Sequence, residues 1–102
     1  MKKILLSTML CLTLNFAAAI DQAIFYYNIG NYNKAREWYE KAAIEGYSNA
    51  QNNLALMYAN GQGVKQDYLK AKEWYEKAAM QGNSKAQRNL DILCSNKPWV
   101  CK

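Results

Sequence analysis

The chain has 102 residues, a formal net charge of +5 and no histidine. The absence of histidine excludes Ser-His-Asp and Cys-His catalysis and every zinc site that contains histidine. Lys2 and Lys3 lie in the leader described next, and without them the net charge falls from +5 to +3. The remaining lysines alternate with glutamates along the chain. We therefore expect no nucleic-acid binding.

The beginning of the chain has the order of a secretory signal peptide. A basic start is followed by residues 4–14, which are apolar apart from Ser7 and Thr8, and by three alanines ending at Ala19, which suit cleavage. We predict residues 1–19 as a signal peptide, cleaved before Ile20, and residues 20–102 as one repeat domain. The alternative is a buried or anchoring helix, but the apolar run is shorter than the roughly 20 residues that span a bilayer. We therefore expect a periplasmic or secreted bacterial protein with no stable membrane insertion after cleavage.

The rest of the chain contains an internal repeat. Residues 32–54 align with residues 68–90 at an offset of 36, and 16 of the 23 aligned positions are identical. A period of this length indicates stacked helical repeats. The pattern predicts five helices, or about two and a half antiparallel helix pairs, near Asp21–Ile29, Asn31–Glu45, Ser48–Asn60, Asp67–Gln81 and Ser84–Cys94.

Local signals mark the helix ends. Ser48 and Ser84 each begin an S-x-x-Q pattern, which predicts a capping box at both positions. Asp67 is expected to cap the fourth helix, and Gly61 is expected to end the third in the left-handed conformation.

The fourth helix shows how the pairs are expected to pack. Ala71, Trp74, Tyr75 and Ala78 fall at i, i+3, i+4 and i+7, on one face. Small alanines beside large rings favour close helix packing. The fold class is therefore predicted as all-α, a short solenoid.

One pattern of residues identifies a family. It consists of Ala50, Leu54, Met57, Tyr58, Gly61, Gly63, Val64, Asp67, Lys70, Ala71, Trp74, Tyr75, Lys77, Ala78, Ala79 and Gly82. In this pattern the chain resembles the Sel-one-like repeats, a subfamily of the tetratricopeptide type, over residues 21–94. The resemblance implies an α-solenoid whose concave face binds a protein or peptide partner, and bacterial members are often exported adaptors. A solenoid this short is expected either to form a homo-oligomer or to be stabilised by its tail.

Two cysteines remain after the expected cleavage. Cys94 and Cys101 form an even pair in an exported chain, which predicts a disulfide that folds the tail back, with Trp99 covering the last helix. A redox pair or two metal ligands are the alternatives, but the spacing is typical of neither. Some exported relatives with a cysteine pair in every repeat are described as penicillin-binding or β-lactamase-like, and this chain lacks that pattern.

No catalytic, metal or cofactor site is predicted. The serines of the mature chain, Ser48, Ser84 and Ser95, are followed three residues later by glutamine or proline, never by the lysine of an S-x-x-K motif. The glutamates recur with the repeat, as on a solvated helix face. We predict an interaction module without enzymatic activity; the alternatives are a β-lactamase-like protein and a dedicated inhibitor or immunity-type binder.

The first helix of each pair is expected to line the concave face. The candidate partner-binding residues on these helices point away from the packing rows and are Phe25, Asn28, Asn49, Asn52, Leu56, Asn60, Lys85 and Arg88, with Asp21 and Ile92 beside them. We expect asparagines to bond a peptide backbone, apolar pockets at Phe25 and Leu56, and a basic end at Arg88 that pairs with a carboxylate. The alternative is ordinary solvated helix surface.

Overall fold

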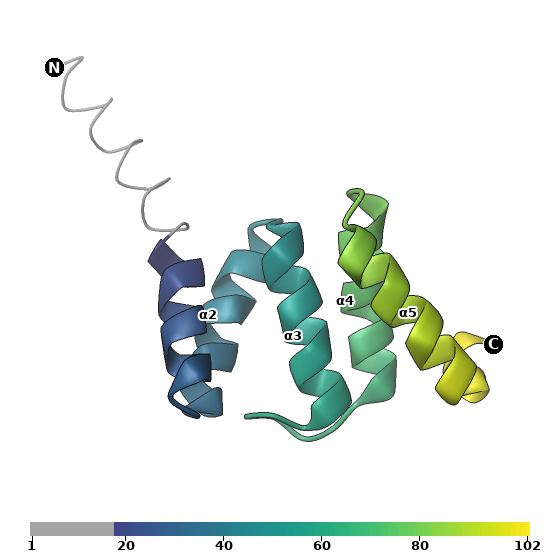
Figure 1. Ribbon diagram of the computed structural model, residues 1–102, viewed down its shortest axis with the longest axis horizontal. Helices are drawn as coiled ribbons and strands as arrows, with labels where there is room; N and C mark the ends of the chain where they lie inside the picture. The colour runs from purple at the N-terminus through teal and green to yellow at the C-terminus, as the bar shows by residue number, and fades with distance from the viewer. Residues whose placement is uncertain (1–17) are drawn as a thin grey trace, which may run out of the picture.

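The computed structural model describes residues 18–102, which form a row of five helices that follow one another along the long axis (Figure 1). An N-terminal helix covers residues 18–28 of the described range. The remaining elements are α2 (Tyr32–Ile44), α3 (Ser48–Asn60), α4 (Tyr68–Met80), α5 (Ser84–Asn96) and the short 3₁₀ helix η1 (Pro98–Cys101). Residues 18–102 contain no strand. The predicted all-α solenoid of five helices is confirmed.

Two neighbouring clusters of buried side chains form the core, and both consist largely of alanines around one tyrosine. The first cluster surrounds Tyr39 and joins the N-terminal helix, α2 and α3. The second surrounds Tyr75 and joins α3, α4, α5 and η1, while Trp74 packs against both clusters. Since Tyr39 and Tyr75 are 36 residues apart, the repeat places the same ring against the same small residues in successive pairs.

Side-chain caps begin three of the helices. Asp67 caps α4 as predicted, because its carboxylate accepts a hydrogen bond from the backbone N–H of Lys70 at 3.0 Å. Asn31 caps α2 and Asn83 caps α5 in the same manner, with distances of 3.3 and 3.0 Å to the backbone N–H groups that they accept from. Each cap satisfies a donor that the first helical turn leaves without a partner.

The predicted capping boxes at Ser48 and Ser84 are wrong. Both serines are the first residues of their helices rather than the caps, and at Ser84 the preceding Asn83 takes the capping role. Gln51, the expected partner in the first box, instead donates from its side chain to the backbone carbonyl of Ala43 at 3.1 Å. That bond joins α3 to the preceding repeat and leaves the glutamine 5% exposed.

The connector between α3 and α4 docks onto α2. Gly61 ends α3 in the left-handed conformation with φ 68°, as predicted. Gly63 also has φ 68°, and a Cβ atom added there would overlap the backbone of Tyr32. The carbonyl of Gly63 accepts a hydrogen bond from Arg36 Nε at 2.9 Å. The glycine therefore allows the connector of one repeat to lie against the first turn of α2.

The C-terminal tail folds back over the last pair. Cys94 and Cys101 are disulfide-bonded in the structure, with Cα atoms 5.6 Å apart. Val100 lies in the second core cluster at 1% exposure. Trp99 is 58% exposed and meets Tyr68 of α4 edge-on, with ring centroids 6.3 Å apart. The expectation that Trp99 covers the end is therefore corrected, since the side chain that closes the core is Val100.

The predicted signal peptide falls almost entirely outside the described residues, which begin at position 18. Within them, Ala19 is helical and 2% exposed, in contact with the first core cluster. Cleavage before Ile20, if it occurs as predicted, removes this alanine from the core. Residues 18–102 contain no helix with the length and apolar character needed to cross a membrane.

Candidate partner-binding groove

A cavity of about 280 Å³ lies between α3 and α5 and is called the amide groove below. Its walls are Leu56, Ala59 and Asn60 of α3, Tyr68 and Tyr75 of α4, Asn89, Ile92, Leu93 and Asn96 of α5, and Gln66 and Lys97 of the flanking segments. Four of these residues carry amide side chains, and four are aliphatic. The groove thus combines aliphatic side chains with uncharged amide groups and one lysine.

The repeat explains why the two helices present matching walls. Leu56 of α3 and Ile92 of α5 are 36 residues apart, as are Asn60 and Asn96. Each helix therefore contributes one branched aliphatic side chain and, one turn later, one asparagine. Because α3 and α5 hold equivalent positions in successive repeats, the same pair of chemical groups is displayed twice along the groove.

Two of the four amides are already bonded within the protein. Gln66 donates from Nε2 to the carbonyl of Ala59 at 2.8 Å and to the hydroxyl of Tyr68 at 3.0 Å. Asn89 donates to Asn52 at 3.0 Å. By contrast, the side chains of Asn60 and Asn96 are exposed and make no hydrogen bond within residues 18–102. These two amides are therefore available to a ligand.

The charge of the groove is carried by one lysine. Lys97 is the one charged residue among the eleven that line it, and its Nζ lies 5.4 Å from the centre of the Tyr68 ring. No carboxylate is present on the walls. A negatively charged group of a ligand could therefore lie near Lys97 without repulsion from a carboxylate on the groove walls.

The structure brings together part of the predicted partner-binding set. Leu56 and Asn60 line the amide groove, and Ile92 lies opposite them. The other predicted residues do not line it: Phe25 and Asn28 lie exposed on the N-terminal helix, Lys85 and Arg88 lie exposed on α5, and Asn49 accepts a hydrogen bond from Asn83 at 3.0 Å.

Asn52 is placed differently from the prediction. It is 7% exposed, and its Oδ1 accepts the hydrogen bond from Asn89 that joins α3 to α5. Its amide therefore connects two repeats instead of facing a partner. The unusual presence of an asparagine within a helix, which suggested a binding role, is explained by this contact.

Several groove residues were not predicted. Gln66 and Lys97 lie outside the helices, where no helical periodicity places them. Tyr75 was predicted on a packing face, and it also forms part of the groove, as does Tyr68. Asn96 could have been found from the sequence, because it stands 36 residues after Asn60.

The described residues contain no group of three or more histidine, cysteine, aspartate or glutamate side chains that could hold a metal ion. Among their titratable side chains, two buried tyrosines have perturbed pKa values. Burial raises the pKa of Tyr75 to about 12. Burial also raises the pKa of Tyr39, although a hydrogen bond with Asn53 acts in the opposite direction. Both rings favour their neutral form, as expected of core residues.

Comparison with known proteins agrees with the fold. A family model described as the Sel1 repeat matches residues 29–47 and 48–83. The crystal structure of a Sel1 repeat protein from Oxalobacter formigenes is similar, with a TM-score of 0.73 and a sequence identity of 36%. The match covers 80% of this chain and 35% of that protein. This chain thus spans about a third of the length of that protein. Among curated proteins, none gives a significant sequence match. Because the two matched repeats cover more than half of its residues, the chain belongs to the Sel1 repeat family.

Proposed function

We propose that this protein is an interaction module whose amide groove binds an extended segment of a protein partner. Sel1 repeats typically act in protein–protein interaction, which supports the general assignment. The observation that carries the proposal is the pair of unbonded amides of Asn60 and Asn96 beside Leu56 and Ile92. A primary amide both donates and accepts, so it can bond the C=O and N–H groups of an extended backbone.

The aliphatic pair provides the rest of the binding energy. Ile92 is 51% exposed, and Leu56 faces it across the groove. An apolar side chain of the partner placed between them would be removed from water, at about 25 cal/mol per Å² of buried apolar area. A cavity of 280 Å³ holds only a short segment, so we expect a dissociation constant in the micromolar range or weaker.

We also propose that the protein is exported and that residues 1–19 are removed on the way. The leader pattern and the bonded pair Cys94–Cys101 support this, because disulfides persist in oxidising compartments. Intact-mass measurement of the protein from the periplasmic and culture fractions of a bacterial host is expected to give a chain that begins at Ile20. Recovery of the full chain in the cytoplasm only would contradict the export proposal.

A peptide library displayed on phage tests the groove assignment. We expect selection on the protein to yield peptides that bind the wild type and lose at least tenfold in affinity for Ile92→Asp. Ile29→Asp is the matched control, because Ile29 is 61% exposed and does not line the groove. Selected peptides that bind both variants equally would show that the groove is not the binding site.

A further inference from the structure

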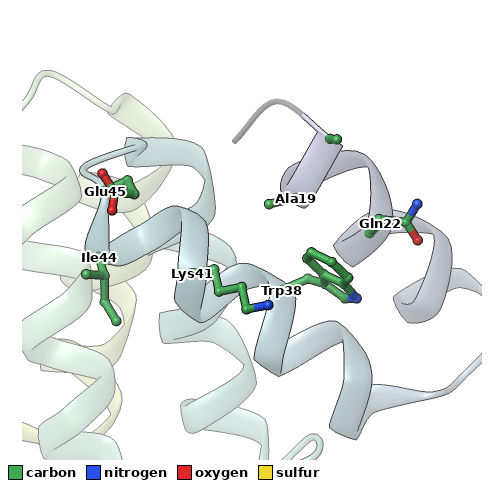
Figure 2. A pocket seen from close by; sticks show the side chains of 7 residues that line it. Ala19, Gln22, Trp38, Lys41, Ile44 and Glu45 are labelled. Atoms are coloured by element: carbon green, nitrogen blue, oxygen red, sulfur yellow. The ribbon is translucent and has the colours of Figure 1, made fainter. Parts of the chain in front are cut away.

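The N-terminal end of the solenoid carries a second, larger cavity. It has a volume of about 690 Å³ and is lined by Ala18, Ala19 and Gln22 of the N-terminal helix and by Trp38, Lys41, Ile44 and Glu45 of α2. Figure 2 shows these side chains around the space between the two helices. We call this surface the N-terminal edge. It shares no residue with the amide groove.

The next repeat presents a counterpart of this surface. Trp38 corresponds to Trp74 by the 36-residue period, and Lys41 corresponds to Lys77. The geometry repeats as well, because each lysine Nζ lies 4.5 Å from the centre of its tryptophan ring. The N-terminal helix matches α3 when Tyr27 is aligned with Tyr58, which pairs the buried Ala19 with the buried Ala50.

In that next repeat, α2 packs against the equivalent surface, which α3 and α4 form. Tyr39, Ala42 and Ala43 of α2 are all buried, at 4%, 0% and 1% exposure, in the cluster that contains Ala50 and contacts Trp74. Two polar contacts accompany this packing. Gln51 donates from its side chain to the backbone carbonyl of Ala43 at 3.1 Å, and Asn53 lies near enough to the Tyr39 hydroxyl to lower its pKa.

At the N-terminal edge the corresponding groups lack this neighbour. Gln22 is the residue that aligns with Asn53, and it is exposed at the wall of the cavity. The chain therefore displays at its N-terminal end the receiving surface of a repeat, with no second helix of a preceding repeat against it within residues 18–102.

We propose that the N-terminal edge binds an amphipathic helix of another polypeptide that carries a tyrosine and two alanines at i, i+3 and i+4, as α2 and α4 do. The internal contact of α2 with the following repeat is the template for this complex. Packing would place the partner's tyrosine hydroxyl near Gln22 and its alanines beside the first turn of the N-terminal helix, at Ala19 in the unprocessed chain. Trp38 is already half-buried against the first core cluster, and the partner would give it a second neighbour, as Trp74 packs against both clusters within the chain.

A second copy of this chain does not supply such a helix. The chain has two helix faces with a tyrosine and two alanines, on α2 and α4, and its own core already covers both. Tyr75 and Ala78 of α4 are 2% and 0% exposed, and the corresponding face of α2 is buried as described above. The expected partner is therefore a different repeat protein that ends in an uncovered second helix. Removal of residues 1–19 would delete Ala18 and Ala19 but leave Gln22, Trp38, Lys41, Ile44 and Glu45 in place, so this larger part of the receiving surface persists in the processed chain.

A stapled peptide with the sequence of residues 67–82 is a suitable probe, with the staple on the face opposite Tyr75 and Ala78. The full chain is expressed in a bacterial host, so that any processing occurs, and is labelled with ¹⁵N. Addition of the peptide is expected to shift the indole N–H signal of Trp38 while the side-chain amide signals of Asn60 and Asn96 stay unchanged.

Two variants and one control peptide give the proposal its test. Gln22→Arg places a charged group in the cavity at an exposed position, and it is expected to weaken binding at least tenfold. Arg88→Glu, exposed on α5, is expected to leave the affinity within twofold. A peptide with Ala78→Glu and Ala79→Glu is expected not to bind. A Trp38 signal that does not move, equal binding by both variants, or equal binding of both peptides would overturn the proposal.

Discussion

Asn52 of α3 accepts a hydrogen bond on its Oδ1 from Nδ2 of Asn89 on α5, at 3.0 Å. This bond joins the first helices of two successive repeats directly beside the amide groove, which Asn89 helps to line. It therefore sets the position of the two groove walls relative to each other. The sequence suggested Asn52 for partner binding. In the structure Asn52 instead holds together the two helices that form the groove walls.

Loss of this bond is expected to destabilise the fold modestly. Asn52→Ala and Asn89→Ala should each lower the free energy of unfolding by about 1 kcal/mol, with a coupling energy of about 0.5 to 1.5 kcal/mol in the double-mutant cycle. Urea denaturation of the four proteins measures these values. Asn33→Ala, at an exposed position on α2, is the control and should be nearly neutral. A coupling energy of zero would show that the two amides do not interact in solution.

The connector glycine is expected to be more sensitive than its neighbours in the turns. Gly63→Ala combines a positive φ with overlap against the backbone of Tyr32, so we expect a loss of about 2 to 4 kcal/mol in the free energy of unfolding. Gly30→Ala is the matched control, because Gly30 has φ 81° with no atom within 4 Å of an added Cβ. That variant should lose only about 1 kcal/mol. Equal losses in the two variants would show that the connector does not pack against α2.

The C-terminal disulfide is expected to stabilise the domain. Reduction of Cys94–Cys101 opens a loop of eight residues, for which the chain-entropy model gives about 2.5 kcal/mol. Val100, which packs in the second core cluster beside this bond, is expected to be held less firmly after reduction. Thermal unfolding followed by circular dichroism, with and without reductant, measures the effect. An unchanged melting temperature after confirmed reduction would exclude a stabilising role for the bond.

Burial of Tyr75 predicts a loss of stability in alkaline solution. The pKa of Tyr75 is about 12 in the folded protein against 10.0 for an exposed tyrosine, so between these values the folded state holds a proton that the unfolded state has released. The free energy of unfolding should fall as the pH rises from 10 to 12, by about 2 to 3 kcal/mol from this residue. In Tyr75→Phe this contribution is absent. The same pH dependence in both proteins would contradict the assignment.

The repeat accounts for the part of the fold that could be predicted. Each 36-residue unit carries the alanine and aromatic positions of both helices, so the local pattern is sufficient to place the helices and their packing faces. The bounds Ser48–Asn60 were obtained in this way and are confirmed. The helix starts were harder, because Asn83 and Ser84 are both good capping residues and only the three-dimensional path of the chain distinguishes them.

The groove was predicted only in part, for a physical reason. Asn52 and Asn60 stand on the same helix, and their exposure depends on where α5 crosses it. That crossing brings Asn89 to Asn52 and leaves Asn60 free. The positions of Gln66 and Lys97 depend on a connector and a tail that have no periodic pattern. Long-range packing of this kind cannot be obtained from one helix at a time.

The central claim is that a partner segment binds between Asn60 and Asn96. The most direct measurement is a titration of ¹⁵N-labelled protein with a peptide selected on it, followed through the side-chain amide signals. The account predicts that the NH₂ signals of Asn60 and Asn96 shift with one common dissociation constant, while that of Asn33 on α2 stays in place. Saturating binding that leaves both groove amides unchanged would contradict the assignment of the amide groove as the binding site.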